Sequence, residues 1–277
     1  MTVKLSAIQL NSKPDVEQNV HAIDAQLAKL ISLENNDEVE HIVVLPECCL
    51  FFGANDQAQL SLAKQTQNNN ELQSSLSQLA KQHKVTLVGG TIPIIAECGN
   101  KFTNTSCAFN SNGDLIGHYD KIHLFDVNVA DSEKAYRESR YTQAGKKACI
   151  VKTPLATIGL SVCFDIRFPS LYQKLSELGA DIITVPSAFT RVTGKAHWQT
   201  LLQARAIENQ VYIIAAGQEG VHVNGRETWG HSMIISPWGE ILASLEQGEG
   251  TITSDFLPLE VQRIRTSMPL KHTLISN

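Results

Sequence analysis

The sequence lacks the features that mark membrane, secreted and nucleic-acid-binding proteins. No uninterrupted apolar run reaches the roughly 18 residues that a membrane span needs. The N-terminal stretch MTVKLSAIQLNSKP alternates like a strand and lacks the charged and apolar regions of a signal peptide. Acidic residues outnumber basic ones, 28 to 23, and no basic block stands out. We therefore expect a cytoplasmic protein with neither a membrane nor a nucleic acid as partner.

Paired cysteines and nucleotide-binding glycine motifs are also missing. The six cysteines are scattered and include no C-x-x-C pair, which argues against a disulfide framework and a structural zinc site in a chain of 277 residues. No G-x-G-x-x-G or P-loop pattern occurs, which weakens a nucleotide-binding interpretation. The sequence predicts reduced thiols.

The chain contains no low-complexity tract and no linker rich in proline, glycine or serine, so we expect a single domain over residues 1–277. Strand-like runs alternate with helical patterns, which predicts an α/β fold. Hairpins at 105–121 and 231–245 add antiparallel pairs, so a purely parallel sheet is not favoured. The polar stretch 127–147 is long for a connection, and we expect it to be functional or disordered.

Hydrophobic periodicity predicts the individual elements. Strands are expected at 4–10, 41–47, 85–94, 148–152, 157–162, 181–185 and 211–218, and helices at 16–33, 71–84, 170–178 and 195–208. The expected apolar face of the last helix consists of Trp198, Leu201, Leu202 and Ile207.

Cys163 lies in 159-GLSVCFDIRFP-169, where an apolar run gives way to charge. α/β folds place ligand sites at the carboxyl ends of strands, and a nearby helix N-terminus is expected to lower the pKa of the thiol. The alternative is a buried cysteine that packs as a small apolar side chain.

Two other strand ends carry groups that a cysteine nucleophile needs. Glu47 ends the apolar run in 43-VVLPE-47 and is either a solvated cap or a carboxylate in a cleft, where a raised pKa would suit general acid/base work. Lys121 lies among apolar and aromatic residues in 119-YDKIHLFD-126 and is either a surface lysine or an oxyanion stabiliser.

Together and in this chain order, the motifs around Glu47, Lys121 and Cys163 resemble the Glu-Lys-Cys triad of the nitrilase, or carbon–nitrogen hydrolase, superfamily. The resemblance runs from Lys4 to about Pro269. The stretches 186-PSAFTRVTGKAHWQTLLQARAIENQVYIIAAGQ-218 and 229-WGHSMIISPWGEILA-243 resemble the Nit amidase branch, and within it the amidases that act on deaminated glutathione. Omega-amidases, which act on 2-oxoglutaramate, are the alternative, and a non-catalytic binding or redox-sensing protein on the same fold is a third.

The resemblance implies a four-layer α-β-β-α sandwich, usually a homodimer, that hydrolyses a small carboxamide without a metal or other cofactor. It implies that Cys163 is the nucleophile, that Glu47 carries protons, and that Lys121 holds the oxyanion together with the backbone N–H of Phe164. Glu138 in 137-RESRYTQAG-145 would position the substrate amide.

Further substrate contacts are expected from Phe164, Arg167, Phe189 and Thr193. Arg167 either contacts the substrate or forms a buried ion pair with Asp165 that braces the turn.

The chain departs from the family pattern at several places. Glu133 is a poorer candidate than Glu138 because it lacks the E-S context. Phe164 stands where tyrosine is frequent. Cys48 and Cys49 beside Glu47 are unusual and are expected to pack behind the glutamate. The stretch 267-SMPLKHTLISN-277 lacks the basic, aromatic-ended tail that commonly helps to form the dimer.

Overall fold

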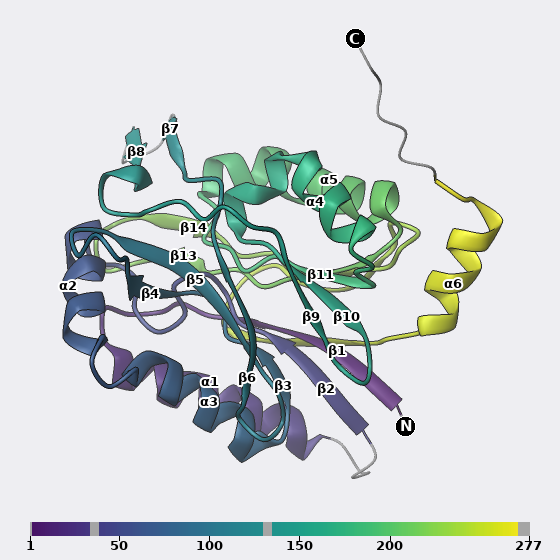
Figure 1. Ribbon diagram of the computed structural model, residues 1–277, viewed down its shortest axis with the longest axis horizontal. Coiled ribbons are helices and arrows are strands. Elements are labelled where there is room, and N and C mark those ends of the chain that lie inside the picture. Colours follow the sequence, from purple (N-terminus) through teal and green to yellow (C-terminus); the bar gives the residue numbers. More distant parts are fainter. Residues whose placement is uncertain (1, 34–38, 130–134, 271–277) are drawn as a thin grey trace.

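Two mixed β-sheets form the centre of the structure, a computed structural model that describes residues 2–33, 39–129 and 135–270 (Figure 1). The first sheet runs in the order β17 (Gly250–Asp255), β1 (Thr2–Gln9), β2 (Val39–Val44), β3 (Thr86–Val88), β5 (Phe102–Phe109) and β4 (Ile92–Ile95), with β6 (Leu115–Asp120) also paired to β5. The second runs β16 (Ile241–Leu245), β15 (Ser232–Ile235), β12 (Tyr212–Ala215), β11 (Ile182–Thr184), β10 (Thr157–Leu160) and β9 (Cys149–Lys152).

Helices cover the outer faces of both sheets and complete four layers (Figure 1). Beside the first sheet lie α1 (Val16–Ser32), α2 (Asp56–Thr66) and α3 (Glu71–His83), and beside the second lie α4 (Pro169–Glu177) and α5 (Arg191–Asn209). The remaining elements are α6 (Pro258–Ser267), the 3-10 helices η1 (Glu138–Arg140) and η2 (Cys163–Arg167), and the ribbons β7 (Asp126–Asn128) with β8 (Ala135–Arg137) and β13 (Glu219–Val221) with β14 (Glu227–Trp229). This arrangement is the predicted α-β-β-α sandwich.

The alternation of strand side chains explains the layers. In β2, Ile42 and Val44 join the cluster between the sheets, while Val43 joins the cluster under α1 and α3. Helix α1 begins where the Asp15 side chain accepts a hydrogen bond from the Gln18 N–H. Central strands such as β2, β11 and β12 are therefore buried on both faces, which explains the near-continuous apolar runs in the sequence.

Most expected elements are present, within a few residues of their predicted ends. Because β1, β2 and β3 are parallel while β5 and β17 pair antiparallel, the expectation of a mixed sheet is confirmed. The expected strand at 85–94 is wrong as one piece, because the chain breaks at Gly89–Gly90 between β3 and β4. The helices α2 and α6 were not expected.

Of the two alternatives for 127–147, functional or disordered, the structure favours the first. The stretch contains most of the β7–β8 ribbon and η1, although 130–134 lie outside the described residues. One further expectation needs correction. Ile207 is 46% exposed, so it does not belong to the apolar face of α5. The buried face is formed by Trp198, Leu202 and Ala206, which follow one another at helical spacing.

Within the described ranges, no helix combines the length and the apolar character that crossing a bilayer requires.

Gly90, shortly after β3, lies against the chain segment that leads into Glu47. Its φ is +54°, and a Cβ built there would lie 2.0 Å from the carbonyl oxygen of Pro46. The segment after β3 thus passes directly against the residue that precedes Glu47, an approach that no larger residue permits without backbone movement.

We predict that Gly90→Ala lowers the free energy of unfolding by about 3 kcal/mol or more, because left-handed strain adds to a backbone clash. Gly99→Ala is the matched control, since Gly99 has φ +70° but nothing within 4 Å of its Cβ position. It should lose only about 1–2 kcal/mol. Urea unfolding measures both, and equal losses would contradict the assignment of the clash.

Candidate functional site

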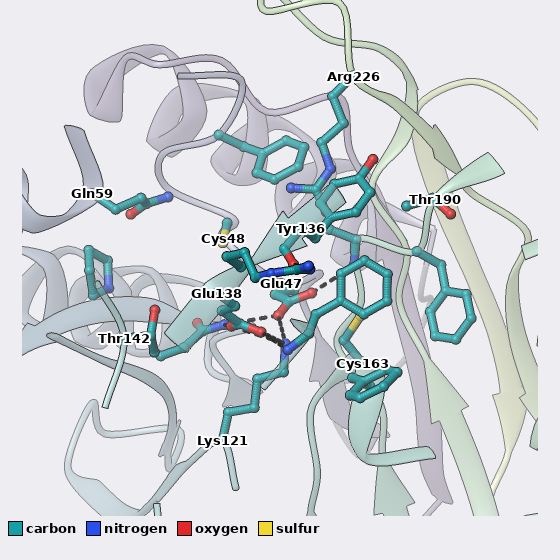
Figure 2. A pocket seen from close by; sticks show the side chains of 18 of the residues that line it. Glu47, Cys48, Gln59, Lys121, Tyr136, Glu138, Thr142, Cys163, Thr190 and Arg226 are labelled. Carbon is teal, nitrogen blue, oxygen red and sulfur yellow. Dashed lines mark hydrogen bonds and ion pairs between the residues drawn. The ribbon is translucent and has the colours of Figure 1, made fainter. Parts of the chain in front are cut away.

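A pocket of about 740 Å³ opens at the end of the sandwich where several strands finish (Figure 2). Glu47 follows β2, Lys121 follows β6 and Cys163 follows β10, and all line this pocket. Of the other expected site residues, those that also line it are Glu138, Phe164, Phe189 and Thr193. Strand ends from both sheets therefore bring together groups that are far apart in the sequence.

Cys163 occupies a sharp backbone turn between β10 and α4. Its φ is +48°, a conformation that costs a non-glycine residue about 1–2 kcal/mol. Its backbone N–H donates to the Pro186 carbonyl at 2.9 Å, and only 7% of the residue is exposed. The turn directs the thiol into the pocket rather than along the sheet (Figure 2).

The buried carboxylate of Asp165 holds this turn. It accepts from the backbone N–H of Val162 at 2.9 Å and from the Tyr119 hydroxyl at 2.8 Å. It also accepts from the backbone N–H and the Nδ1 of His123, at 3.1 and 2.7 Å. The partners that brace the turn are thus Tyr119 and His123, and the expected ion pair between Asp165 and Arg167 is wrong.

One ammonium group connects two carboxylates at the bottom of the pocket. Nζ of Lys121 donates to Oε1 of Glu47 at 2.8 Å and to Oε2 of Glu138 at 2.9 Å. Asn104 Nδ2 donates to the same two carboxylates, at 2.9 and 3.3 Å. Only 2% of the lysine side chain is exposed, so the alternative of a surface lysine is wrong.

Glu47 accepts hydrogen bonds from other groups besides Lys121. Its Oε2 accepts from the Ala188 backbone N–H at 3.0 Å, and its Oε1 accepts from Asn104 Nδ2 at 2.9 Å. Burial alone raises the pKa of Glu47, but the charge of Lys121 and its hydrogen bond outweigh it and lower the pKa below 4.5. The expected raised pKa of Glu47 is therefore wrong.

Glu138 shows the opposite shift. Burial raises the pKa of Glu138, Lys121 lowers it, and the negative charge of Glu47 raises it again, with a net increase above 4.5. The pKa of Lys121 is well above 10.5, because the two carboxylates outweigh its burial. Since two buried carboxylates share one ammonium, the second of them holds its proton more strongly.

Burial, and then the charge of Glu47, raises the pKa of the Cys163 thiol well above 9.0. The expectation that a helix N-terminus favours the thiolate is wrong, since η2 has only five residues and a carboxylate faces the sulfur. These shifts favour a protonated thiol and an ionised Glu47 in the same pocket. Such a pair can transfer a proton as the sulfur attacks an electrophile.

The expected substrate contacts are only partly placed in the pocket. Phe189 packs its ring 4.8 Å from Trp198, and Thr193 shares a 2.8 Å hydroxyl hydrogen bond with Thr190. Arg167 is not among the lining residues: its guanidinium lies over the rings of Phe164 and Phe189. Direct contact between Arg167 and a substrate stays a prediction.

The two cysteines beside Glu47 lie in different surroundings. Cys49 packs behind Glu47, with Sγ 3.3 Å from the Gly89 carbonyl, whereas Cys48 lines the pocket, contrary to expectation.

Glu133 and residues 271–277 lie outside the described residues. Among the described residues, no group of three or more metal-ligating side chains comes together. No hydrogen-bond acceptor in the described part of the chain meets the Phe164 N–H.

Sequence reasoning missed Asn104 and Arg226. Asn104 joins Glu47 to Glu138 from within a buried strand, and an asparagine directly before the expected hairpin at 105–121 was the only signal. Arg226 reaches the pocket from the loop between β13 and β14, and a single arginine beside a glycine carries no recognisable pattern.

The opposite pKa shifts predict opposite pH effects on stability. Glu138, with a raised pKa, contributes stability below the unfolded value of 4.5 and loses it as the pH rises. As the pH rises from 4.5 to neutrality, the free energy of unfolding of Glu138→Gln should therefore increase relative to that of the parent. Glu47, with a lowered pKa, contributes stability above 4.5 and loses it as the pH falls.

Glu47→Gln should accordingly lose about 2 kcal/mol relative to the parent at neutral pH, and less at acid pH. Urea unfolding across this range measures both variants. Glu177→Gln, at the exposed end of α4, controls for the substitution itself. If the free energies of unfolding of both variants changed with pH in the same direction relative to the parent, the assignment of one ammonium shared by the two carboxylates would be refuted.

Known proteins match both the sequence and the fold. The deaminated glutathione amidase of Yersinia enterocolitica is 38% identical over 96% of this chain and 91% of its own length. A protein of the same name from Synechocystis is 40% identical, over 96% of both chains. Nit3 of Saccharomyces cerevisiae, described as a member of branch 10 of the nitrilase superfamily, superimposes with a TM-score of 0.86 at 30% identity and covers 98% of this chain.

The sequence model of the carbon–nitrogen hydrolase family matches residues 4–266, nearly the whole chain. The match contains every strand that ends at the pocket. The chain therefore belongs to the carbon–nitrogen hydrolase family, the hydrolases of carbon–nitrogen bonds other than peptide bonds.

Proposed function

We propose that this protein hydrolyses deaminated glutathione to 2-oxoglutarate and cysteinylglycine through a thioester on Cys163. The observation that carries the proposal is the pocket shared by Cys163, Glu47 and Lys121, in which the Glu47 carboxylate is bound to Lys121 at 2.8 Å. The names of the Yersinia and Synechocystis relatives support the choice of substrate.

In the first step, the sulfur of Cys163 attacks the amide carbonyl carbon while its proton moves to Glu47. The attack forms the carbon–sulfur bond and places a negative charge on the carbonyl oxygen. The Lys121 ammonium and the Phe164 N–H are the donors that stabilise this oxyanion. A thiol with a raised pKa suits this route, because its proton leaves only as the bond forms.

In the second step, the carbon–nitrogen bond breaks and the leaving amine takes the proton from Glu47. A water molecule then attacks the thioester, and Glu47 accepts a proton from it. Collapse of the second tetrahedral intermediate releases the carboxylic acid and returns the proton to the sulfur. Glu47 acts as base in both attacks, which requires the ionised form that its lowered pKa maintains.

Glu138 acts through position rather than proton transfer. It binds Nζ of Lys121 together with Glu47, and its Oε2 also accepts from the Phe125 N–H at 2.7 Å. This carboxylate therefore keeps the ammonium between both acids and offers an acceptor to the substrate amide N–H.

We predict that Cys163→Ala lowers kcat/KM for deaminated glutathione by at least about 10³-fold, because the nucleophile is lost. The parent enzyme, quenched during turnover, should carry the acyl mass on Cys163, and Cys98→Ser, at an exposed cysteine, should carry it equally. Undiminished turnover by Cys163→Ala would remove the nucleophile assignment. A large preference for 2-oxoglutaramate, assayed beside deaminated glutathione, would instead favour omega-amidase activity.

We further propose that residues 1–277 act as one catalytic domain, in the cytoplasm and as a homodimer. The six unpaired cysteines support a reducing compartment. Exposed apolar side chains at the C-terminal ends of α5 and α6 support self-association: Ile207 is 46%, Met268 40% and Leu270 46% exposed. The side chain of Gln210 binds the Met268 carbonyl at 2.7 Å and links these two helix ends.

We predict that the double substitution Ile207→Glu and Met268→Glu weakens the dimer at least about tenfold, because charge replaces buried apolar area. Sedimentation equilibrium measures the dissociation constant. Leu33→Glu, at an exposed position after α1, is the matched control and should leave it unchanged. A monomeric parent at about 10 μM would refute the homodimer.

A further inference from the structure

Arg226 reaches into the pocket as a clamped cation. Its guanidinium carbon lies 5.2 Å from the ring centre of Phe52 and 4.8 Å from that of Tyr136. Figure 2 shows it entering from the edge opposite Lys121. Two aromatic rings therefore restrict the guanidinium group, and its in-plane N–H groups are the part left for a ligand.

The other cations that line the pocket already have acceptors. Lys121 donates to Glu47 and Glu138. The guanidinium of Arg137 donates to the carbonyls of Val127 and Tyr136, at 3.1 and 2.7 Å, and to the side chain of Asn128 at 3.0 Å.

Arg226 differs from both. Its Nε is buried, and no acceptor among the described residues bonds it. The neighbouring Glu227 instead pairs with Arg191 at 3.1 Å. A buried N–H without an acceptor is destabilising, so the position favours a ligand that supplies one. The fork of a guanidinium group matches the two oxygens of a carboxylate.

The clamp also determines on which side of the scissile bond this carboxylate lies. Phe52 follows Glu47 by one short loop, and Tyr136 precedes Glu138 on the same segment. Arg226 lines the same pocket as Glu47, and its charge is near enough to lower the pKa of that carboxylate. Arg226 therefore lies on the side of Glu47, the acid that protonates the leaving amine. The opposite wall, beside Cys163, consists of Phe164 and Phe189.

From this placement we infer that Arg226 is a specificity-determining residue that binds a carboxylate carried by the leaving amine. The inference rests on the proposed function, since it takes Glu47 as the group that protonates the leaving amine. It accounts for a preference for amides that release an amino acid or a dipeptide over amides that release ammonia. Cysteinylglycine, with its terminal carboxylate, belongs to the favoured class.

The test compares deaminated glutathione with its C-terminal carboxamide, which has the same acyl group and scissile bond but no carboxylate on the leaving amine. In Arg226→Gln, the ratio of kcat/KM for the acid to that for the carboxamide should fall roughly 10- to 100-fold, as expected for a lost charged hydrogen bond. Arg226→Lys should retain part of the ratio, because it keeps the charge without the fork.

The ratio removes effects that are common to both substrates. The charge of Arg226 also lowers the pKa of Glu47, but less than the charge of Lys121 does. Losing this effect in Arg226→Gln changes the rates for the acid and for the carboxamide alike. Arg191→Gln is the matched control, an exposed arginine that pairs with the neighbouring Glu227 and does not line the pocket. It should keep the parent ratio.

An unchanged ratio in Arg226→Gln would overturn the inference and leave Arg226 a structural role. The inference would also be overturned if Arg226→Gln instead lowered the ratio of kcat/KM between deaminated glutathione and an analogue whose acyl-part carboxylate is amidated. If the parent hydrolyses neither substrate, the proposed function fails separately. Calorimetric binding of the acid and the carboxamide to Cys163→Ala, with and without Arg226→Gln, still decides the inference: an unchanged difference in affinity overturns it, and a reduced one supports it.

Discussion

The arrangement of the site depends on one buried ammonium group shared by two buried carboxylates. Each carboxylate loses hydration in the pocket, and Lys121 compensates for both through contacts of 2.8 and 2.9 Å. Since it cannot neutralise both fully, their pKa values move in opposite directions, downward for Glu47 and upward for Glu138. This asymmetry leaves Glu47 ionised beside a protonated thiol, and proton transfer between them needs no other base.

The two sheets make this juxtaposition possible. Glu47 and Lys121 follow strands of the first sheet, while Cys163 follows a strand of the second, and the packed faces bring these strand ends together. The strained turn at Cys163 is held from both sides, by the Pro186 carbonyl and by the Asp165 carboxylate. A large buried core supplies the free energy that this local strain requires.

The α/β class and most elements were predictable from sequence, because apolar periodicity carries them. The motifs around Glu47, Lys121 and Cys163 marked residues that the structure brings into one pocket. The break at Gly89–Gly90 was missed because the glycines stand within an apolar run that reads as one strand. Helix α2 was missed because its sequence, DQAQLSLAKQT, has few apolar residues. The exposure of Ile207 follows from helical geometry, because a residue five positions after Leu202 is turned about 140° away from it on a helix of 3.6 residues per turn.

The sequence by itself determined which chemical groups are present and which segments carry them. Cys163 and Glu47 stand at the ends of apolar runs, Lys121 follows a hairpin strand, and Glu138 lies in a polar stretch. Only the tertiary structure decided their protonation, because a pKa depends on burial and on charges from distant segments. It also decided that Asp165 pairs with Tyr119 and His123 instead of Arg167. In the same way it brought Arg226 to the pocket, since the sequence of one loop says nothing about which rings from other segments enclose it.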